Sequence, residues 1–185
     1  MKPRIILDLC GGTGSWSKPY REAGYDVRLI TLPENDVRIW QEYIQLQVHG
    51  VLAAPPCTYF CVMRNCRGKP SVDQLREGLS VVDACLRIIT TVQPKWWALE
   101  NPEGSLKHWI GIPKFKFQPW EYGDPWTKKT LLWGNFNPPV FGSAVQPKYN
   151  LVQSRGHQVE GQAHTAESRS VTPPGFAQAF FEVNP

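Results

Sequence analysis

The chain has 185 residues, which is enough for one domain with a sizeable core and leaves little room for a second. Its hydrophobic share of 42% and charged share of 19% are ordinary for a soluble globular protein, and a net charge of +4 is compatible with a polyanionic partner without establishing one. The sequence contains no signal peptide and no apolar run that could span a membrane. We therefore expect a cytoplasmic protein with reduced cysteines, no membrane contact and no metal site.

The first element is a strand at residues 4–10, followed by a glycine turn at 11–14 and a helix at about 15–23. This arrangement is typical of a nucleotide cradle, because glycines let the backbone approach a ligand and a helix start offers N–H donors. Ser17 replaces the third glycine of the dinucleotide fingerprint, which favours a nucleoside site over a pyrophosphate site. A purely structural tight turn is the alternative.

A second strand is expected at residues 26–31. Nucleoside-binding folds commonly carry an acid at its end that holds the ribose hydroxyls, and here Thr31 takes that place, with Glu34 near enough to substitute. Asp36 follows. Its carboxylate could accept a hydrogen bond from an adenine amino group, or it could be an ordinary turn aspartate.

A short apolar run at residues 50–54 reads as a buried strand, and Pro55 and Pro56 end it. Cys57 is therefore presented at the end of a strand. In an open α/β sheet, ligands bind in the crevice at that end. Residues 58–69 form a basic, glycine-containing segment that suits a lid closing on a phosphate backbone, with a solvated loop as the alternative.

Ser71 and Gln74 resemble a capping box, and apolar residues then recur at helical spacing through a long amphipathic helix. Residues 95–102 read as a further apolar strand that ends in polar residues and a proline. Glu100 thus falls at the same sheet edge as Cys57. A partly buried carboxyl group can stay protonated near neutral pH and act as an acid, although a plain strand-end glutamate fits the local sequence equally well.

The remaining chain is harder to interpret. Residues 104–123 read as an irregular aromatic wall, 126–133 as one strand with two lysines at its entry, and 134–168 as loops with one hairpin at most. A last helix is expected at 175–182. Together these elements predict an α/β fold with a mostly parallel central sheet and helices on both faces.

The order of these motifs resembles that of the DNA (cytosine-5)-methyltransferases. The similar stretches are 8–14 (the cofactor turn), 35–37 (the adenine site), 55–57 (Pro-Pro-Cys, the nucleophile), 100–102 (Glu-Asn-Pro), 128–130 (in place of a basic strand) and 172–181 (the closing helix). The resemblance implies a Rossmann-like fold that depends on S-adenosylmethionine. It also implies that residues 1–185 form a single catalytic domain.

The resemblance also implies the chemistry. The Cys57 thiolate would add to carbon 6 of a cytosine flipped out of DNA, Glu100 would assist at ring nitrogen 3, and S-adenosylmethionine would give its methyl group to carbon 5. The implied cofactor-binding residues are Asp8, Leu9, Cys10, Gly12, Gly14, Trp16, Asp36, Val37 and Pro55. The implied substrate-binding residues are Asn101, Pro102, Arg64, Lys128, Lys129 and Thr130.

Three departures from the family pattern shape what we expect. Cys10 stands where the family has a phenylalanine that stacks on adenine, the ribose acid is missing at Thr31, and residues 134–168 form only a reduced loop region in place of a target-recognition domain. We expect low sequence specificity, a protein partner that reads DNA, or an unusual substrate. The compact chain suggests a phage or mobile-element protein in a bacterial or phage-infected host cytoplasm.

Two other functions stay open from the sequence. One is a non-catalytic nucleic-acid-binding or accessory module of the same fold. The other is a cytosine-modifying enzyme that acts on RNA or nucleotides, or that uses a modified S-adenosylmethionine.

Overall fold

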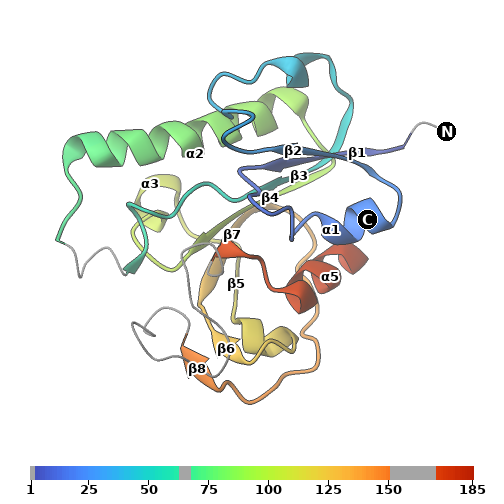
Figure 1. Ribbon diagram of the computed structural model, residues 1–185, viewed down its shortest axis with the longest axis vertical. Coiled ribbons are helices and arrows are strands. Elements are labelled where there is room, and N and C mark those ends of the chain that lie inside the picture. Colours follow the sequence, from blue (N-terminus) through green and yellow to red (C-terminus); the bar gives the residue numbers. More distant parts are fainter. Residues whose placement is uncertain (1–2, 63–67, 151–169) are drawn as a thin grey trace.

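A six-stranded sheet forms the centre of the computed structural model, which describes residues 3–62, 68–150 and 170–185 (Figure 1). The strands of this sheet, in spatial order, are β2 (Asp26–Ile30), β1 (Ile5–Leu9), β3 (Val48–Ala53), β4 (Trp96–Pro102), β7 (Thr130–Asn135) and β5 (Phe115–Phe117). A second, two-stranded sheet pairs β6 (Trp126–Thr127) with β8 (Tyr149–Asn150). The helices are α1 (Lys18–Glu22), α2 (Val72–Val92), α3 (Lys107–Ile110) and α5 (Pro174–Val183), with the 3-10 turns η1 (Glu42–Gln45) and η3 (Pro119–Tyr122). No helix in the described ranges is long and apolar enough to cross a membrane.

The first four strands of the sheet run parallel, and β7 and β5 are added in antiparallel pairs. The chain passes from β1 to β2 on one side and then returns to place β3 on the other side of β1. The order therefore reverses between β1 and β3. In open α/β sheets the crevice at such a switch point, outside the carboxyl ends of the strands, is where ligands bind.

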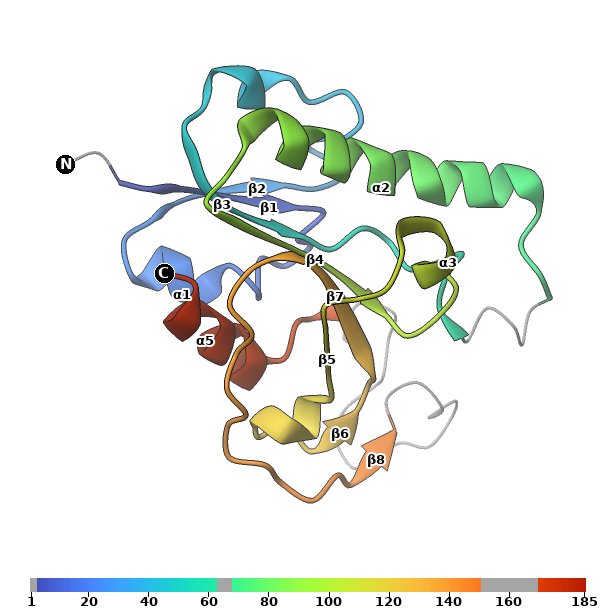
Figure 2. The same cartoon turned by 180° about the vertical axis from the view of Figure 1, so that it is seen from behind.

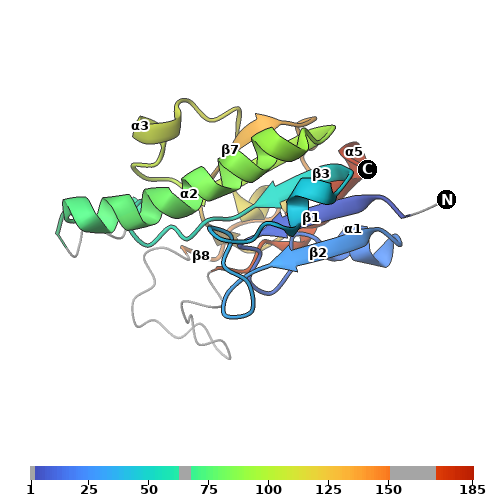
Figure 3. The same ribbon diagram turned by 90° about the horizontal axis from the view of Figure 1, so that it is seen from above.

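Helices cover both faces of the sheet, as Figures 1 and 3 show. Successive residues of a strand point to opposite faces, so each strand contributes to two cores. Leu7 of β1 lies in a cluster with Ile88 of α2. Its neighbour Ile6 lies in a second cluster with Phe180 of α5. This arrangement confirms the predicted α/β class with helices on both faces.

The long helix α2 begins as the sequence predicts. The backbone N–H of Gln74 donates to the Ser71 hydroxyl at 3.2 Å, and the Ser71 N–H donates to the Gln74 side chain at 3.1 Å. These two bonds satisfy donors that the first helical turn leaves without partners. Gln93, in the left-handed conformation, ends the helix.

Four expectations about secondary structure need correction. The first helix starts at Lys18 rather than at residue 15, because the glycine turn continues through Ser17. The stretch 126–133 is divided between β6 and β7, which lie in different sheets. The wall at 104–123 contains α3, β5 and η3. In the described part of 134–168, β8 pairs in parallel with β6, and no hairpin is formed there.

Candidate active site

Cys57 and Glu100 lie at the same edge of the sheet. Strands β3 and β4 are parallel neighbours in which Ala53 is paired with Leu99, so both chains leave the sheet at its carboxyl edge. Glu100 follows Leu99 directly, and Cys57 comes after the two prolines that end β3. The expected placement of the two residues at one edge is confirmed, and their catalytic roles stay predictions.

Hydrogen bonds tie the turn that carries Cys57 to the segment around Glu100. The Asn101 side-chain amide, which is fully buried, donates to the Pro55 carbonyl at 2.9 Å. Beyond β4, the Ser105 N–H donates to the Phe60 carbonyl at 2.7 Å. The Phe60 N–H in turn donates to the carbonyl of Cys57 at 3.0 Å. The two strand ends are therefore held in a fixed relation on both sides of Cys57.

The Cys57 thiol has an environment that keeps it protonated. A hydrogen bond with the Cys61 thiol, burial and the negative charge of Glu100 together raise the pKa of Cys57, and the positive charge of Lys128 opposes them. Burial also raises the pKa of Glu100, again against Lys128. Cys57, Glu100 and Lys128 thus act electrostatically on one another and form one cluster.

The two lysines after β6 lie in different environments. Lys129 Nζ is 2.9 Å from Glu103 Oε1 in an ion pair, whereas Lys128 is the lysine whose charge reaches Cys57 and Glu100. Thr130 is buried, and its hydroxyl donates to the Lys128 carbonyl at 2.8 Å. Thr130 therefore supports the backbone beneath Lys128, and its predicted contact with substrate stays untested.

We predict that Gly104→Ala disrupts this arrangement. A Cβ at residue 104 would overlap the Phe60 carbonyl oxygen, which belongs to the turn that carries Cys57. Overpacking of this kind costs about 1–3 kcal/mol of folding free energy. The position of Cys57 should shift with the Phe60 carbonyl, because both belong to the same turn.

Gly142→Ala is the matched control for that variant. The atom nearest to a Cβ there is Tyr122 Cα at 3.5 Å, an ordinary contact. Urea unfolding should be measured for both variants. Equal behaviour of Gly104→Ala and Gly142→Ala would contradict the prediction.

The glycine turn after β1 has the conformation that a cofactor cradle requires. Cys10, Gly12 and Gly14 have φ values of 57°, 54° and 69°, in the left-handed region that glycine favours. A Cβ at Gly11 would overlap the Asp8 carboxyl group, so the chain must pass directly over that group. Among the described residues, no atom beyond the chain neighbours of Gly12 lies within 4 Å of a Cβ built on it, so this side of the turn is open. These features fit a ligand that approaches the backbone closely.

Asp8 lies beneath this turn and is fully buried. The Ser17 hydroxyl donates to Asp8 Oδ2 at 2.5 Å, and Asp8 Oδ1 has no hydrogen-bond partner among the described residues. Burial raises the pKa of Asp8 from 3.8 to about 6, while the Ser17 bond and the charge of Arg21 act in the opposite direction. Ser17, which breaks the dinucleotide fingerprint, is thus the residue that fixes the acid under the turn.

The pKa of Asp8 leads to a prediction about stability. Because the folded state binds the proton more tightly than the unfolded state, the free energy of unfolding should fall as pH rises from about 4 to about 6 and then level off. The difference between 3.8 and about 6 corresponds to about 3 kcal/mol. Asp8→Asn keeps an acceptor for Ser17 without the charge. It should be more stable than the wild type at pH 8, and this advantage should vanish near pH 4.

Urea unfolding at pH 4, 6 and 8 tests this expectation. Asp73→Asn is a suitable control, because the Asp73 side chain is 90% exposed. Parallel pH profiles for Asp8→Asn and the wild type would show that Asp8 does not carry the effect.

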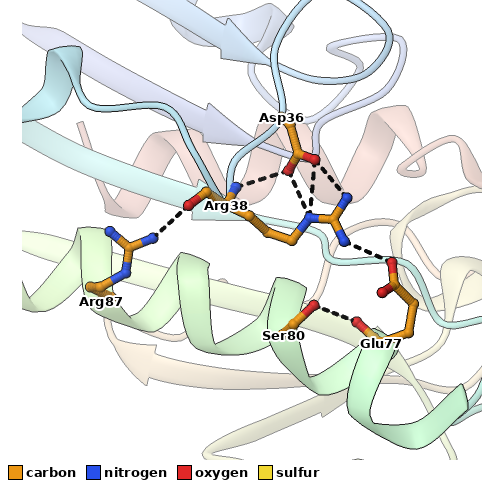
Figure 4. A network of polar contacts seen from close by, with 5 residues as sticks. All are labelled: Asp36, Arg38, Glu77, Ser80 and Arg87. Atoms are coloured by element: carbon orange, nitrogen blue, oxygen red, sulfur yellow. Dashed lines mark hydrogen bonds and ion pairs between the residues drawn. The ribbon is translucent and has the colours of Figure 1, made fainter. Parts of the chain in front are cut away.

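Asp36 is already engaged by protein groups (Figure 4). Its carboxylate accepts hydrogen bonds from the Arg38 backbone N–H and guanidinium, the shortest at 2.6 Å to Nη2. Arg38 also reaches Glu77 on α2 at 2.7 Å, and its carbonyl accepts a bond from Arg87. This network joins the loop after β2 to α2. An adenine amino group would therefore have to share Asp36 with Arg38.

Three other predicted cofactor residues lie in the cores. The side chains of Leu9, Trp16 and Val37 are at most 4% exposed. Trp16 packs edge-on against Phe180, with ring centroids 5.5 Å apart. Contact of these residues with a cofactor would have to come from their backbones. Arg64, a predicted substrate residue, lies outside the described residues.

Sequence reasoning missed the roles of Cys61 and Arg38. Cys61 is four positions after Cys57, and its N–H donates to the Cys57 carbonyl at 3.0 Å, so the two thiols belong to one turn. Arg38 is two positions after Asp36. In both cases the spacing was visible, but it indicates a contact only once the local backbone turn is known.

Comparison with known proteins gives three findings. No family model matches the chain. The chain is 30% identical over 147 residues to a probable DNA (cytosine-5)-methyltransferase of frog virus 3 (isolate Goorha), and the match covers 69% of each protein. It is also similar, with a TM-score of 0.57 and 15% identity, to the crystal structure of a putative DNA modification methyltransferase encoded within an E. coli prophage. That match covers 78% of this chain and 52% of the other, so the chain spans about half the length of that protein, and the likeness supports the fold.

Proposed function

Because the chain belongs to the DNA (cytosine-5)-methyltransferase family, we propose that it transfers a methyl group from S-adenosylmethionine to carbon 5 of cytosine in DNA. The observation that carries the proposal is the cluster of Cys57, Glu100 and Lys128 at the carboxyl edge of the parallel strands. A thiol, a carboxyl group with a raised pKa and a cation are the groups that addition to a cytosine ring requires.

In the proposed reaction, the sulfur of Cys57 forms a bond to carbon 6 of cytosine. Glu100, whose pKa is raised, gives a proton to ring nitrogen 3, so that the electrons of the ring shift towards carbon 5. Carbon 5 can then bond to the methyl group. The carbon 5 proton then leaves to water, the proton on ring nitrogen 3 returns to Glu100, and the Cys57 sulfur leaves carbon 6 as a thiolate, which restores the aromatic ring and the enzyme.

In this proposal, groups near Cys57 have to favour ionisation of its thiol. The thiol has a raised pKa in the protein alone, so substrate binding has to shift the balance towards the thiolate. While Glu100 keeps its proton it carries no negative charge, so it does not oppose ionisation of Cys57 until the proton has moved to the base. Lys128 favours the thiolate throughout and is, of the two lysines, the one we assign to the base or its phosphate.

S-adenosylmethionine supplies an electrophilic methyl group when bound. The residues that would hold it are Asp8, Cys10, Gly12 and Gly14 of the turn after β1, with Asp36 and Val37 in the loop after β2 and Pro55 after β3. The turn lies beside the switch point of the sheet, next to the strand that leads to Cys57. The methyl group and the thiol would thus approach the same base from neighbouring strand ends.

A covalent trap tests the proposal. The protein is incubated with labelled S-adenosylmethionine and duplex DNA that contains 5-fluorocytosine, whose fluorine cannot leave as a proton does. A stable adduct between protein and DNA is the expected result, together with 5-methylcytosine in nucleosides from ordinary DNA. Transfer to RNA or to free nucleotides with none to duplex DNA would overturn the choice of substrate.

A non-catalytic accessory module is the second candidate. It is favoured by the engagement of Asp36 with Arg38 and by the absence of an acid at Thr31. Calorimetry separates the two candidates, because micromolar binding of S-adenosylmethionine belongs to the enzyme alone. In either case residues 1–185 would act as one domain in the cytoplasm, and a protein partner would be needed for sequence specificity unless the chain itself reads DNA.

A further inference from the structure

The loop that carries α3, residues 104–113, is anchored directly beside Cys57. Gly104 forms an antiparallel bridge with Cys61. The Ser105 hydroxyl and N–H both donate to the Phe60 carbonyl, and the side chain of Leu106 is buried in the core. Figures 1 and 2 show α3 at the carboxyl end of β4, below α2. The α3 loop is therefore held in place at the carboxyl edge of the sheet, beside Cys57.

Two large apolar side chains of the α3 loop point away from the core. Trp109 is 51% exposed and Ile112 is 91% exposed. Single exposed apolar residues are common on protein surfaces. Two of them on one short loop, anchored beside a candidate nucleophile, indicate a contact surface.

The ionisable side chains within residues 104–120 are all basic, and the acidic residues Glu103 and Glu121 lie just outside this stretch. The basic residues are Lys107, His108, Lys114 and Lys116. Lys114 is used within the fold, where its ammonium donates to the Phe136 carbonyl at 2.5 Å. Lys107 and His108 are exposed, and Lys107 forms no ion pair with any described residue. An exposed lysine and histidine beside an aromatic side chain are complementary to a nucleic-acid backbone and its bases.

We propose that the α3 loop is a DNA-binding wedge, in which Trp109 and Ile112 pack against the bases next to the cytosine that reaches Cys57, while Lys107 binds a neighbouring phosphate. This inference rests on the proposed function, because a base must leave the duplex to reach a thiol at the sheet edge. The base steps beside a flipped base lose stacking, and apolar wedges in other DNA-binding proteins fill such openings. The wedge would give the chain a DNA contact of its own beside Cys57.

Binding of wild type and variants to a labelled cytosine-containing duplex, measured by fluorescence anisotropy, tests the wedge. Trp109→Ala should raise the Kd about tenfold, and Trp109→Phe should raise it less, because phenylalanine still stacks. Lys107→Gln should reduce the slope of log Kd against log salt concentration by about 0.9, the value for one lost phosphate contact. Phe141→Ala, which removes another exposed aromatic side chain, and Lys18→Gln, on α1, should leave both quantities unchanged.

Binding of S-adenosylmethionine by each variant, measured by calorimetry, shows whether the site has stayed folded. Ile112→Ser provides a second variant of the wedge, at a position where 91% exposure excludes a packing role. Unchanged DNA binding by both Trp109→Ala and Ile112→Ser would overturn the wedge. A dimeric wild type that becomes monomeric on Trp109→Ala, with DNA binding unchanged, would overturn it in favour of a protein interface.

The two proposals fail in different ways. A wild type that binds duplex DNA but transfers no methyl group contradicts the proposed function, while the effects of Trp109→Ala and Lys107→Gln on Kd remain measurable and support the wedge. A wild type that methylates DNA, with Trp109→Ala binding as tightly, contradicts the wedge alone.

Discussion

Cys57→Ala is expected to abolish methyl transfer and the covalent adduct with 5-fluorocytosine DNA. Without the sulfur no bond to carbon 6 can form, and carbon 5 alone is a poor nucleophile. The rate should fall by roughly 10⁴-fold or more, as for the loss of other enzymatic nucleophiles. Incorporation of labelled methyl groups into DNA measures the rate, and calorimetry with S-adenosylmethionine checks that the cofactor site is intact.

Cys61→Ala is the matched control, because it removes the other thiol of the same turn. It should retain methyl transfer within about tenfold, since Cys61 forms no bond to the base in the proposed reaction. The bond with Cys61 raises the pKa of Cys57, so its removal lowers that pKa and leaves more thiolate at pH 8. Alkylation of Cys57 by iodoacetamide should therefore be faster in Cys61→Ala than in the wild type. An equal loss of methyl transfer in both variants would contradict the assignment of Cys57.

The location of the candidate site could be predicted from the sequence because its signals are local. Cys57 and Glu100 each follow a short apolar run, and a proline lies within three residues after the end of each run. A parallel arrangement then brings the two residues to one edge. The capping box at Ser71 was predictable for the same reason, since its two partners are three residues apart.

The surroundings of the site could not be predicted, because they depend on contacts between distant segments. Residues 126–133 read as one strand from their composition. In the folded protein the Lys128 N–H donates to the Gln118 side chain at 2.9 Å, and the Lys129 carbonyl accepts from the Glu103 N–H at 2.8 Å. These bonds take the two lysines out of the strand and give them different environments. Nothing within residues 126–133 specifies those partners.

The cofactor side of the site illustrates a different limit. The sequence predicts a ligand-binding role for Asp36 and shows that Ser17 breaks the glycine pattern. It does not indicate which groups these two side chains contact. The structure pairs Asp36 with Arg38 and places Ser17 on the buried Asp8. In both contacts the two residues are close in sequence: Asp36 is paired with Arg38, and Asp8 with Ser17. Their geometry follows from the tight turns between the strands, which residue types alone do not define.

Glu100→Gln is expected to slow methyl transfer by about 10²–10⁴-fold, the range for loss of a general acid. Glutamine fills the same volume and can still donate a hydrogen bond, but it cannot give a proton to ring nitrogen 3. The addition of Cys57 to carbon 6 would then build up charge on the base that nothing neutralises. Single-turnover measurement of methyl transfer isolates this step from product release.

Glu103→Gln is the control for Glu100→Gln, because it changes a carboxyl group three positions away that is paired with Lys129. That ion pair is partly exposed, with 36% of the Glu103 side chain accessible, so its loss should cost at most about 1 kcal/mol of stability and leave the rate nearly unchanged.

The pH profile of methyl transfer adds a second measurement. Burial raises the pKa of Glu100, so the proton it donates is lost only at higher pH than for an ordinary glutamate. The wild-type rate should therefore decline on the alkaline side of that pKa, and Glu100→Gln should lack this decline. A decline that persists unchanged in Glu100→Gln would assign the acid to another group.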